Sequence, residues 1–269
     1  MAADAAMNSD TALLFLDFDG VVCNSEAECF ASSWLTWHTH FAPPLPDRMA
    51  RSLRRRFHAL RPLISSGEDY VLIQQLIAAE EADGDAFPAE QQVFDAARQA
   101  AGAERMGAFK TTLAETRAEF LANRKQEWLR LNPLYPHVRQ LLLDAGDLSR
   151  IRILSTKASG LIAEILAAAG IRLAAEAIMH APSRPGGQDA RKLELIEQEL
   201  QGSAYDSAVF VEDQFEHLTG PCRFAVRRLL CDWGYALPTI LADSELLASH
   251  DVHCVGAAEL ADLMRRLTS

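Results

Sequence analysis

Residues 12–20, ALLFLDFDG, decide the fold of this 269-residue chain. Apolar residues run without interruption from Ala12 to Leu16 and stop abruptly at the acidic Asp17. An apolar run of this length is typical of a buried strand in a parallel sheet, because such a strand has apolar neighbours on both faces. We therefore predict a central strand at residues 12–16, followed directly by the carboxylates of Asp17 and Asp19.

Similar short apolar runs recur later in the chain, with helix-like segments between several of them. The runs cover residues 151–154, 177–179, 208–211 and 228–231, and a weaker one covers residues 252–255. Residues 159–169 and 192–200 carry apolar side chains at helical spacing, and a glycine lies just beyond each segment. Strands that alternate with helices in this way predict an α/β fold with a doubly wound parallel sheet.

Residues 25–132 break this rhythm, because their periodicity is helical and they contain no convincing strand. Ser66 to Asp69 resembles a capping box at the start of a helix, and a long amphipathic segment runs from Ala103 to Asn132. We therefore predict a Rossmann-like core formed by residues 1–24 and 133–269. A helical cap domain of residues 25–132 is inserted just after the first strand.

Composition excludes several classes of protein. A formal charge of -11 and a pI near 5.2 argue against general binding to nucleic acid or to an anionic membrane. The first ten residues lack the features of a signal peptide, and no apolar run approaches the roughly 20 residues of a membrane helix. The five cysteines form no CxxC pair, which favours a reduced, cytoplasmic compartment.

Polar side chains follow the predicted strands at the points where the strands end. In an open parallel sheet, ligands bind beyond the carboxyl ends of the strands, so these side chains are expected to converge on one edge. They are Asp17 and Asp19 after the first strand, Ser155, Thr156 and Lys157 after the second, Glu212 and Asp213 after the fourth, and Asp232 to Tyr235 after the fifth.

This set of side chains suits one kind of chemistry. Several carboxylates in a small space repel each other unless a cation joins them, and an all-oxygen set selects a hard ion such as Mg²⁺. A metal ion beside hydroxyls and a lysine suits a phosphoryl group. One carboxylate is then available to attack phosphorus, and a second to protonate the leaving oxygen and activate water. The pair Asp17 and Asp19 supplies both.

At this point the sequence resembles a known superfamily. LLFLDFDGVVCNS is similar to the first motif of the haloacid dehalogenase-like hydrolases, which implies that Asp17 is the nucleophile and Asp19 the acid/base. ILSTK resembles the second motif, ARKLELIEQEL the third and VFVEDQ the fourth. The resemblance implies that Ser155, Thr156, Lys157 and Lys192 bind phosphate, and that Asp17, Asp19 through its backbone carbonyl, Asp213 and Glu212 hold Mg²⁺.

The motifs span the whole chain in the expected order. The position of the insertion resembles the subfamily of phosphoglycolate phosphatase and β-phosphoglucomutase. One departure is His217, which stands where many members have another aspartate, with Glu216 beside it. The third motif follows the loop of residues 182–191, and Lys157 is a second candidate for the work assigned to Lys192.

Each of these residues also has a purely structural interpretation. Ser155 is a possible helix cap, and Lys157 and Lys192 are possible surface lysines. Trp233 and Tyr235 are expected to be packed aromatics, and the basic run of residues 51–61 is typical of a solvated helix face. Because related enzymes close a cap over the active site, the resemblance also suggests Arg54, Arg61 and Tyr70 as residues that read the substrate's leaving group.

The sequence thus predicts a Mg²⁺-dependent phosphatase that acts on a small phosphorylated metabolite through an aspartyl-phosphate. One alternative is a phosphomutase of the same superfamily, which would use the same residues. Another is a catalytically weak binding or regulatory protein that keeps the scaffold, and His217 motivates it. Nucleic-acid binding through the arginine run is a weaker option, and a dehalogenase is disfavoured because resembling enzymes lack a counterpart of Asp19. The oligomeric state stays open.

Overall fold

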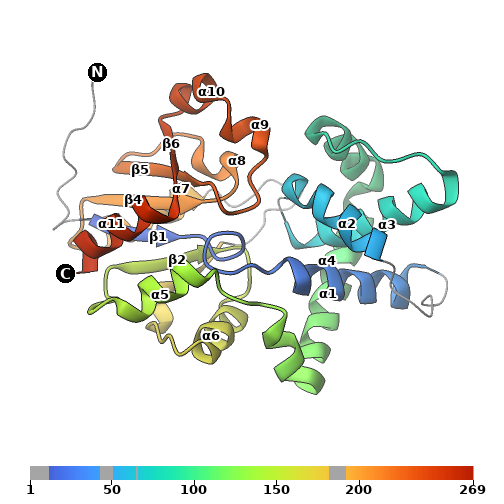
Figure 1. Ribbon diagram of the computed structural model, residues 1–269, viewed down its shortest axis with the longest axis horizontal. Helices are drawn as coiled ribbons and strands as arrows, with labels where there is room; N and C mark the ends of the chain where they lie inside the picture. The colour runs from blue at the N-terminus through green and yellow to red at the C-terminus, as the bar shows by residue number, and fades with distance from the viewer. Residues whose placement is uncertain (1–11, 43–50, 65, 182–191, 269) are drawn as a thin grey trace. The chain divides into compact units, whose positions relative to one another are not determined.

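The computed structural model describes residues 12–42, 51–64, 66–181 and 192–268. These residues form two compact units. The core unit comprises the described residues of 12–24 and of 134–268, and the helical unit comprises the described residues of 25–133. Figure 1 shows both units with most of their helices and strands labelled.

A six-stranded parallel sheet forms the centre of the core unit, with the strand order β3-β2-β1-β4-β5-β6. The strands are β1 (Ala12–Leu16), β2 (Ile151–Ser155), β3 (Ile178–His180), β4 (Ser207–Glu212), β5 (Ala225–Cys231) and β6 (Val252–Val255). β1 lies between β2 and β4, so that Leu14 is paired with Ile151 on one side and with Val209 on the other. All residues of β1 are buried, as the apolar run predicted.

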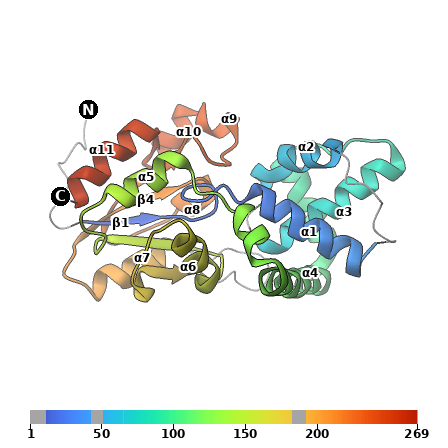
Figure 2. The ribbon, with the colours of Figure 1, turned by 60° about the horizontal axis from the view of Figure 1, so that its bottom comes forward.

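Helices cover both faces of this sheet, which confirms the doubly wound α/β fold (Figure 2). They are α5 (Pro136–Asp144), α6 (Ser159–Ala168), α7 (Lys192–Gln201), α8 (Phe215–Leu218), α9 (Pro238–Leu241), α10 (Ser244–Ser249) and α11 (Ala257–Thr268), with a short turn η3 (Ala175–Ala177). Apolar side chains of α7 pack in one cluster with Leu13 and Phe15 of β1. Because side chains alternate along a strand, Leu14 and Leu16 face the opposite side of the sheet, where α5 and α11 lie (Figure 2).

The helical unit contains α1 (Glu26–His40), α2 (Arg51–Leu60), η2 (Arg61–Leu63), α3 (Gly67–Asp83) and α4 (Gln91–Arg130). The capping box is present at the start of α3, where the backbone N–H of Ser66 donates to Asp69 Oδ2 over 3.0 Å. α4 is interrupted at Gly102, whose φ of 77° and ψ of 159° are not helical. The amphipathic segment predicted from Ala103 therefore begins directly after this break. The described residues of this unit contain no strand.

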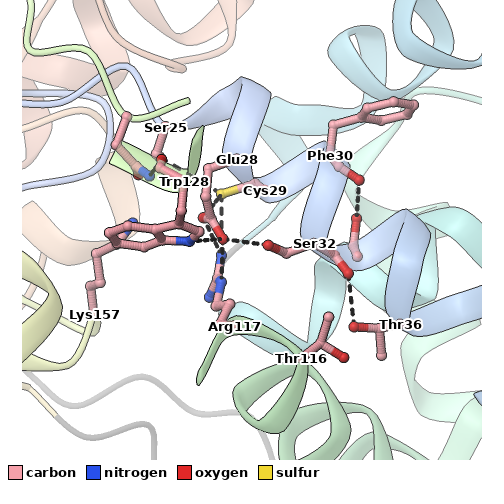
Figure 3. A network of polar contacts seen from close by, with 12 residues as sticks. Ser25, Glu28, Cys29, Phe30, Ser32, Thr36, Thr116, Arg117, Trp128 and Lys157 are labelled. Carbon is pink, nitrogen blue, oxygen red and sulfur yellow. Dashed lines mark hydrogen bonds and ion pairs between the residues drawn. The ribbon is translucent and has the colours of Figure 1, made fainter. Parts of the chain in front are cut away.

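A buried polar network lies inside the helical unit, centred on the carboxylate of Glu28 (Figure 3). Arg117 of α4 donates from Nε and Nη2 to the two oxygens of Glu28, each over 2.8 Å. Ser32 Oγ donates to Glu28 Oε1 over 2.6 Å, and Trp128 Nε1 donates to the same oxygen over 3.3 Å. This network links α1 to two positions along α4.

The structure also bears on membrane-spanning helices and on disulfide bonds. Among the described residues, no helix is both long enough and apolar enough to cross a membrane. All five cysteines are free of disulfide bonds.

Candidate active site

The carboxyl end of β1 places Asp17 at the edge of the sheet. Its backbone N–H donates to the carbonyl of Val211 in β4 over 3.0 Å, and its side chain is buried. Directly after Asp17 the chain turns tightly, because the N–H groups of Val22 and Cys23 both donate to the carbonyl of Phe18. This turn holds Asp19 beside the strand end.

Two glycines allow the backbone to approach Asp213 closely. Gly20 has a φ of 100°, and a Cβ atom at this position would lie 2.0 Å from Asp213 Oδ2. A Cβ atom at Gly234 would lie 2.4 Å from Asp213 Cβ. Any larger residue at either position would collide with this carboxylate. That these two glycines enclose Asp213 was not predicted from the sequence.

Lys192 connects the carboxylates of two neighbouring strands. It is the first residue of α7 and is only 2% exposed. Its Nζ atom lies 2.7 Å from Asp17 Oδ1 and 2.6 Å from Glu212 Oε2. A surface lysine on an amphipathic helix would not be buried between two acids. The structure therefore contradicts the interpretation of Lys192 as a surface lysine.

Glu212 and Asp213 follow each other at the end of β4, and protein groups orient both. Glu212 Oε1 accepts the backbone N–H groups of Asp213 and Gln214, over 3.0 and 3.2 Å. His217 Nδ1 lies 3.2 Å from Glu212 Oε2. Asp213 Oδ2 accepts the backbone N–H of Tyr235 over 3.0 Å. His217, the departure from the family pattern, thus lies beside Glu212 and inside the site.

The buried charges shift one another's pKa values. Burial, followed by repulsion from Glu212, raises the pKa of Asp17 to about 6 even though Lys192 opposes the shift. Burial alone would raise the pKa of Glu212, but the attraction of Lys192 and His217 outweighs it and holds the pKa well below its ordinary value. Burial alone would lower the pKa of Lys192, but Asp17 and Glu212 raise it above its ordinary value. Lys192 therefore stays charged beside these acids.

The donor set at this edge fits a hard divalent ion. Asp17, Glu212 and Asp213 each offer a carboxylate oxygen, these oxygens lie within 4.8 Å of one another, and all three residues are buried. An ion with octahedral bonds of about 2.1 Å requires oxygens separated by roughly 3.0 to 4.2 Å, so small side-chain movements are sufficient. Oxygen ligands alone suit Mg²⁺ better than zinc or copper.

The segment after β2 brings three more of the predicted residues to the site. Ser155 is buried at the end of the strand, and its Oγ atom accepts the backbone N–H of Lys157 over 3.3 Å. Thr156 is partly buried beside it. Lys157 Nζ lies 2.9 Å from Asp19 Oδ1. The carboxylate of Asp19 is therefore in contact with a different lysine from that of Asp17.

The residues suggested for substrate specificity lie in the helical unit. Arg61 and Tyr70 are together, with the guanidinium carbon of Arg61 5.2 Å from the centre of the Tyr70 ring, and both are buried. Arg54 is exposed on α2. In the core unit, Tyr235 is buried, and the Trp233 indole donates from Nε1 to the carbonyl of Val21.

Comparison with solved structures establishes the type of fold. The chain is similar to a predicted phosphoglycolate phosphatase from Haemophilus somnus 129PT, with 16% identity, a TM-score of 0.56, and coverage of 96% of this chain and 99% of the other. A haloacid dehalogenase-like hydrolase from Streptococcus pneumoniae shows 17% identity and a TM-score of 0.51, covering 95% of this chain and 99% of the other. The chain has the haloacid dehalogenase-like fold. A predicted phosphatase from Clostridium acetobutylicum shows 13% identity and a TM-score of 0.52, covering 96% and 100%.

These similarities confirm the predicted fold along nearly the whole chain. At such identities they establish the haloacid dehalogenase-like fold and not the activity. No protein-family model and no curated protein matches the chain.

Proposed function

We propose that this protein is a Mg²⁺-dependent phosphatase that hydrolyses a small phosphorylated metabolite through an aspartyl-phosphate on Asp17. One observation carries this proposal. The buried carboxylate of Asp17 lies 2.7 Å from the ammonium of Lys192 and shares one cluster with Glu212 and Asp213. A nucleophile, a phosphate-neutralising cation and oxygen ligands for a metal are thus adjacent. Similarity in fold to two predicted phosphatases supports the same conclusion.

Two carboxyl groups account for the covalent steps. An oxygen of Asp17 attacks phosphorus, the bond between phosphorus and the ester oxygen breaks, and that oxygen takes a proton from Asp19 as the alcohol leaves. Water then attacks the phosphorus of the aspartyl-phosphate and gives its proton to Asp19. The bond between phosphorus and Asp17 breaks, and inorganic phosphate is released. Both aspartates return to their starting states.

The remaining residues bind and orient the phosphoryl group. Its oxygens would be held by the hydroxyls and ammonium groups predicted for this role, those of Ser155, Thr156, Lys157 and Lys192. Mg²⁺ would be held by Asp17, the backbone carbonyl of Asp19, Asp213 and Glu212. When bound, the ion neutralises negative charge on the phosphoryl oxygens and lowers their repulsion toward an attacking carboxylate.

Substrate specificity is assigned to the helical unit. We propose that three side chains recognise the part of the substrate that leaves with the ester oxygen. These are the paired Arg61 and Tyr70, together with Arg54. An Arg61→Ala variant is expected to raise KM for the physiological substrate while kcat changes less. An unchanged KM would remove Arg61 from this role.

We also propose that the enzyme is cytoplasmic and that its partners are small metabolites. Cysteines without disulfide bonds support a cytoplasmic location, which cell fractionation tests. The acidic charge of the chain supports small metabolites rather than nucleic acid as partners. A gel-shift assay at low salt is expected to show no complex with DNA or RNA.

The decisive experiment is hydrolysis of a generic aryl phosphate with and without Mg²⁺. We expect phosphate release that requires the ion and that disappears in an Asp17→Asn variant with an unchanged circular dichroism spectrum. Activity retained by this variant would exclude Asp17 as the nucleophile. A panel of phosphorylated metabolites then identifies the substrate. Isomerised product in place of free phosphate would indicate a phosphomutase.

A further inference from the structure

Two buried lysines of the core unit contact three of the carboxylates of the site. The whole chain contains only four lysines, at positions 110, 125, 157 and 192. Lys192 contacts Asp17 and Glu212, and Lys157 contacts Asp19. The proposed nucleophile and the proposed acid/base are thus each in contact with an ammonium group of their own.

The fold fixes the position of the Lys157 side chain. Its backbone N–H donates to Ser155 Oγ over 3.3 Å, and its Nζ atom lies 5.8 Å from the centre of the Phe18 ring. His180 Nδ1 lies 3.3 Å from its backbone carbonyl. Only 2% of the Lys157 side chain is exposed, against 19% for Asp19. Because the Lys157 side chain is already enclosed, it loses little conformational entropy when its ammonium group binds a carboxylate. It can therefore hold the Asp19 carboxyl in a fixed orientation.

We propose that Lys157 is a positioning residue for Asp19. The ammonium group orients the Asp19 carboxyl and stabilises the negative charge that develops there as the proton passes to the leaving oxygen. This inference rests on the proposed phosphatase function and assigns Lys157 a task beyond binding the phosphoryl group. A fixed charge lowers the activation barrier most when it lies beside the atom on which charge develops. Lys157 Nζ lies 2.9 Å from Asp19 Oδ1, where negative charge develops as the proton leaves.

A positioning role and a phosphate-binding role predict different dependences on the leaving group. Proton donation matters little when the departing alcohol is already a stable anion, and it matters greatly when the alcohol is basic. A residue that only binds the phosphoryl group contributes equally to every ester, because all esters share that group. A residue that acts through Asp19 contributes more as the leaving group becomes more basic.

The test compares kcat/KM for para-nitrophenyl, phenyl and alkyl phosphates, in order of increasing leaving-group basicity. The variants are Lys157→Met, Asp19→Asn and the double variant, with Lys110→Met as the control because Lys110 is an exposed lysine of α4. Any loss through phosphate binding is shared by all three esters, so we expect kcat/KM of Lys157→Met to fall at least about tenfold further on the alkyl ester than on the nitrophenyl ester. In the Asp19→Asn background, adding Lys157→Met is expected to leave no such difference between the esters, because coupled residues are not additive.

The outcomes separate the two proposals. A leaving-group dependence that steepens in Lys157→Met toward that of Asp19→Asn supports the positioning role. An equal loss on all three esters, or full additivity with Asp19→Asn, overturns it and leaves the phosphatase function intact. A wild-type protein that releases phosphate from no ester overturns the proposed function, and this inference with it. A loss caused by general misfolding is recognised by a lowered Tm, and it would also be equal for all esters.

Discussion

The ion pair between Glu28 and Arg117 allows a prediction about the stability of the helical unit. Glu28 is fully buried, and both of its oxygens accept hydrogen bonds from Arg117. Attraction by Glu28 outweighs burial and raises the pKa of Arg117, so the guanidinium stays charged. An Arg117→Met variant leaves a buried carboxylate without its cation. Breaking a buried pair in this way costs about 3 to 5 kcal/mol.

The lower end of this range is expected, because Ser32 and Trp128 still donate to Glu28 after the substitution. With a urea dependence of about 2 kcal/mol/M, a loss of 3 kcal/mol lowers the unfolding midpoint by about 1.5 M. The assay is urea unfolding followed by tryptophan fluorescence. Three of the four tryptophans, Trp34, Trp37 and Trp128, belong to the helical unit, so this signal reports mainly on that unit.

Two further variants make the prediction refutable. In a Glu28→Leu/Arg117→Met double variant both charges are gone, and the cost is expected to fall well below the sum of the single variants. The control is Glu259→Gln, which breaks the exposed pair with Arg227 and is expected to change stability by no more than about 0.5 kcal/mol. An Arg117→Met midpoint that moves no further than that of the control would refute the reasoning.

Three other predictions concern backbone geometry and the metal. A Gly20→Ala variant is expected to lose about 100-fold in kcat/KM, because its Cβ atom would displace Asp213, and normal turnover would contradict the close approach. Mg²⁺ at one hundred times its dissociation constant is expected to stabilise the protein by about 2.7 kcal/mol in a thermal-shift assay, and an Asp213→Asn variant is expected to lose most of this gain. If the variant gained as much as the wild type, the ion would have to bind elsewhere. A Gly102→Ala variant is expected to cost about 1 to 3 kcal/mol in urea unfolding, because a φ of 77° with a ψ of 159° strains any residue but glycine, and an unchanged midpoint would show that α4 can straighten.

Much of the fold could be predicted because buried parallel strands have a simple sequence signature. Every predicted apolar run corresponds to a strand, and the run at residues 252–255 matches β6 without any shift. The start of β5 was missed by three residues because Ala225 to Arg227 are exposed or partly exposed, so their sequence is not continuously apolar. The sequence predicted that an amphipathic segment begins at Ala103, but it did not reveal that the helix breaks at Gly102. A glycine does not by itself reveal a change in backbone direction.

The site could be predicted less completely than the fold. A position just after a strand identifies which side chains reach the edge of the sheet, and this reasoning selected Asp17, Ser155 and Asp213. It does not show which cation meets which acid. Lys192 and Asp17 are 175 positions apart in sequence, and only the packing of α7 beside β4 brings them together. The contact between Lys157 and Asp19 was likewise not predicted, because these residues are also far apart in the sequence.

The burial of two of the four lysines affects how this protein can be chemically labelled. Amine-directed reagents need an accessible, deprotonated amine, and the raised pKa and burial of Lys192 remove both conditions. Lys157 is enclosed to the same degree. The exposed side chains of Lys110 and Lys125 both lie on α4, so a fluorophore or a surface linker attached through lysine would mark the helical unit. Such a conjugate would leave the phosphate-handling groups chemically intact.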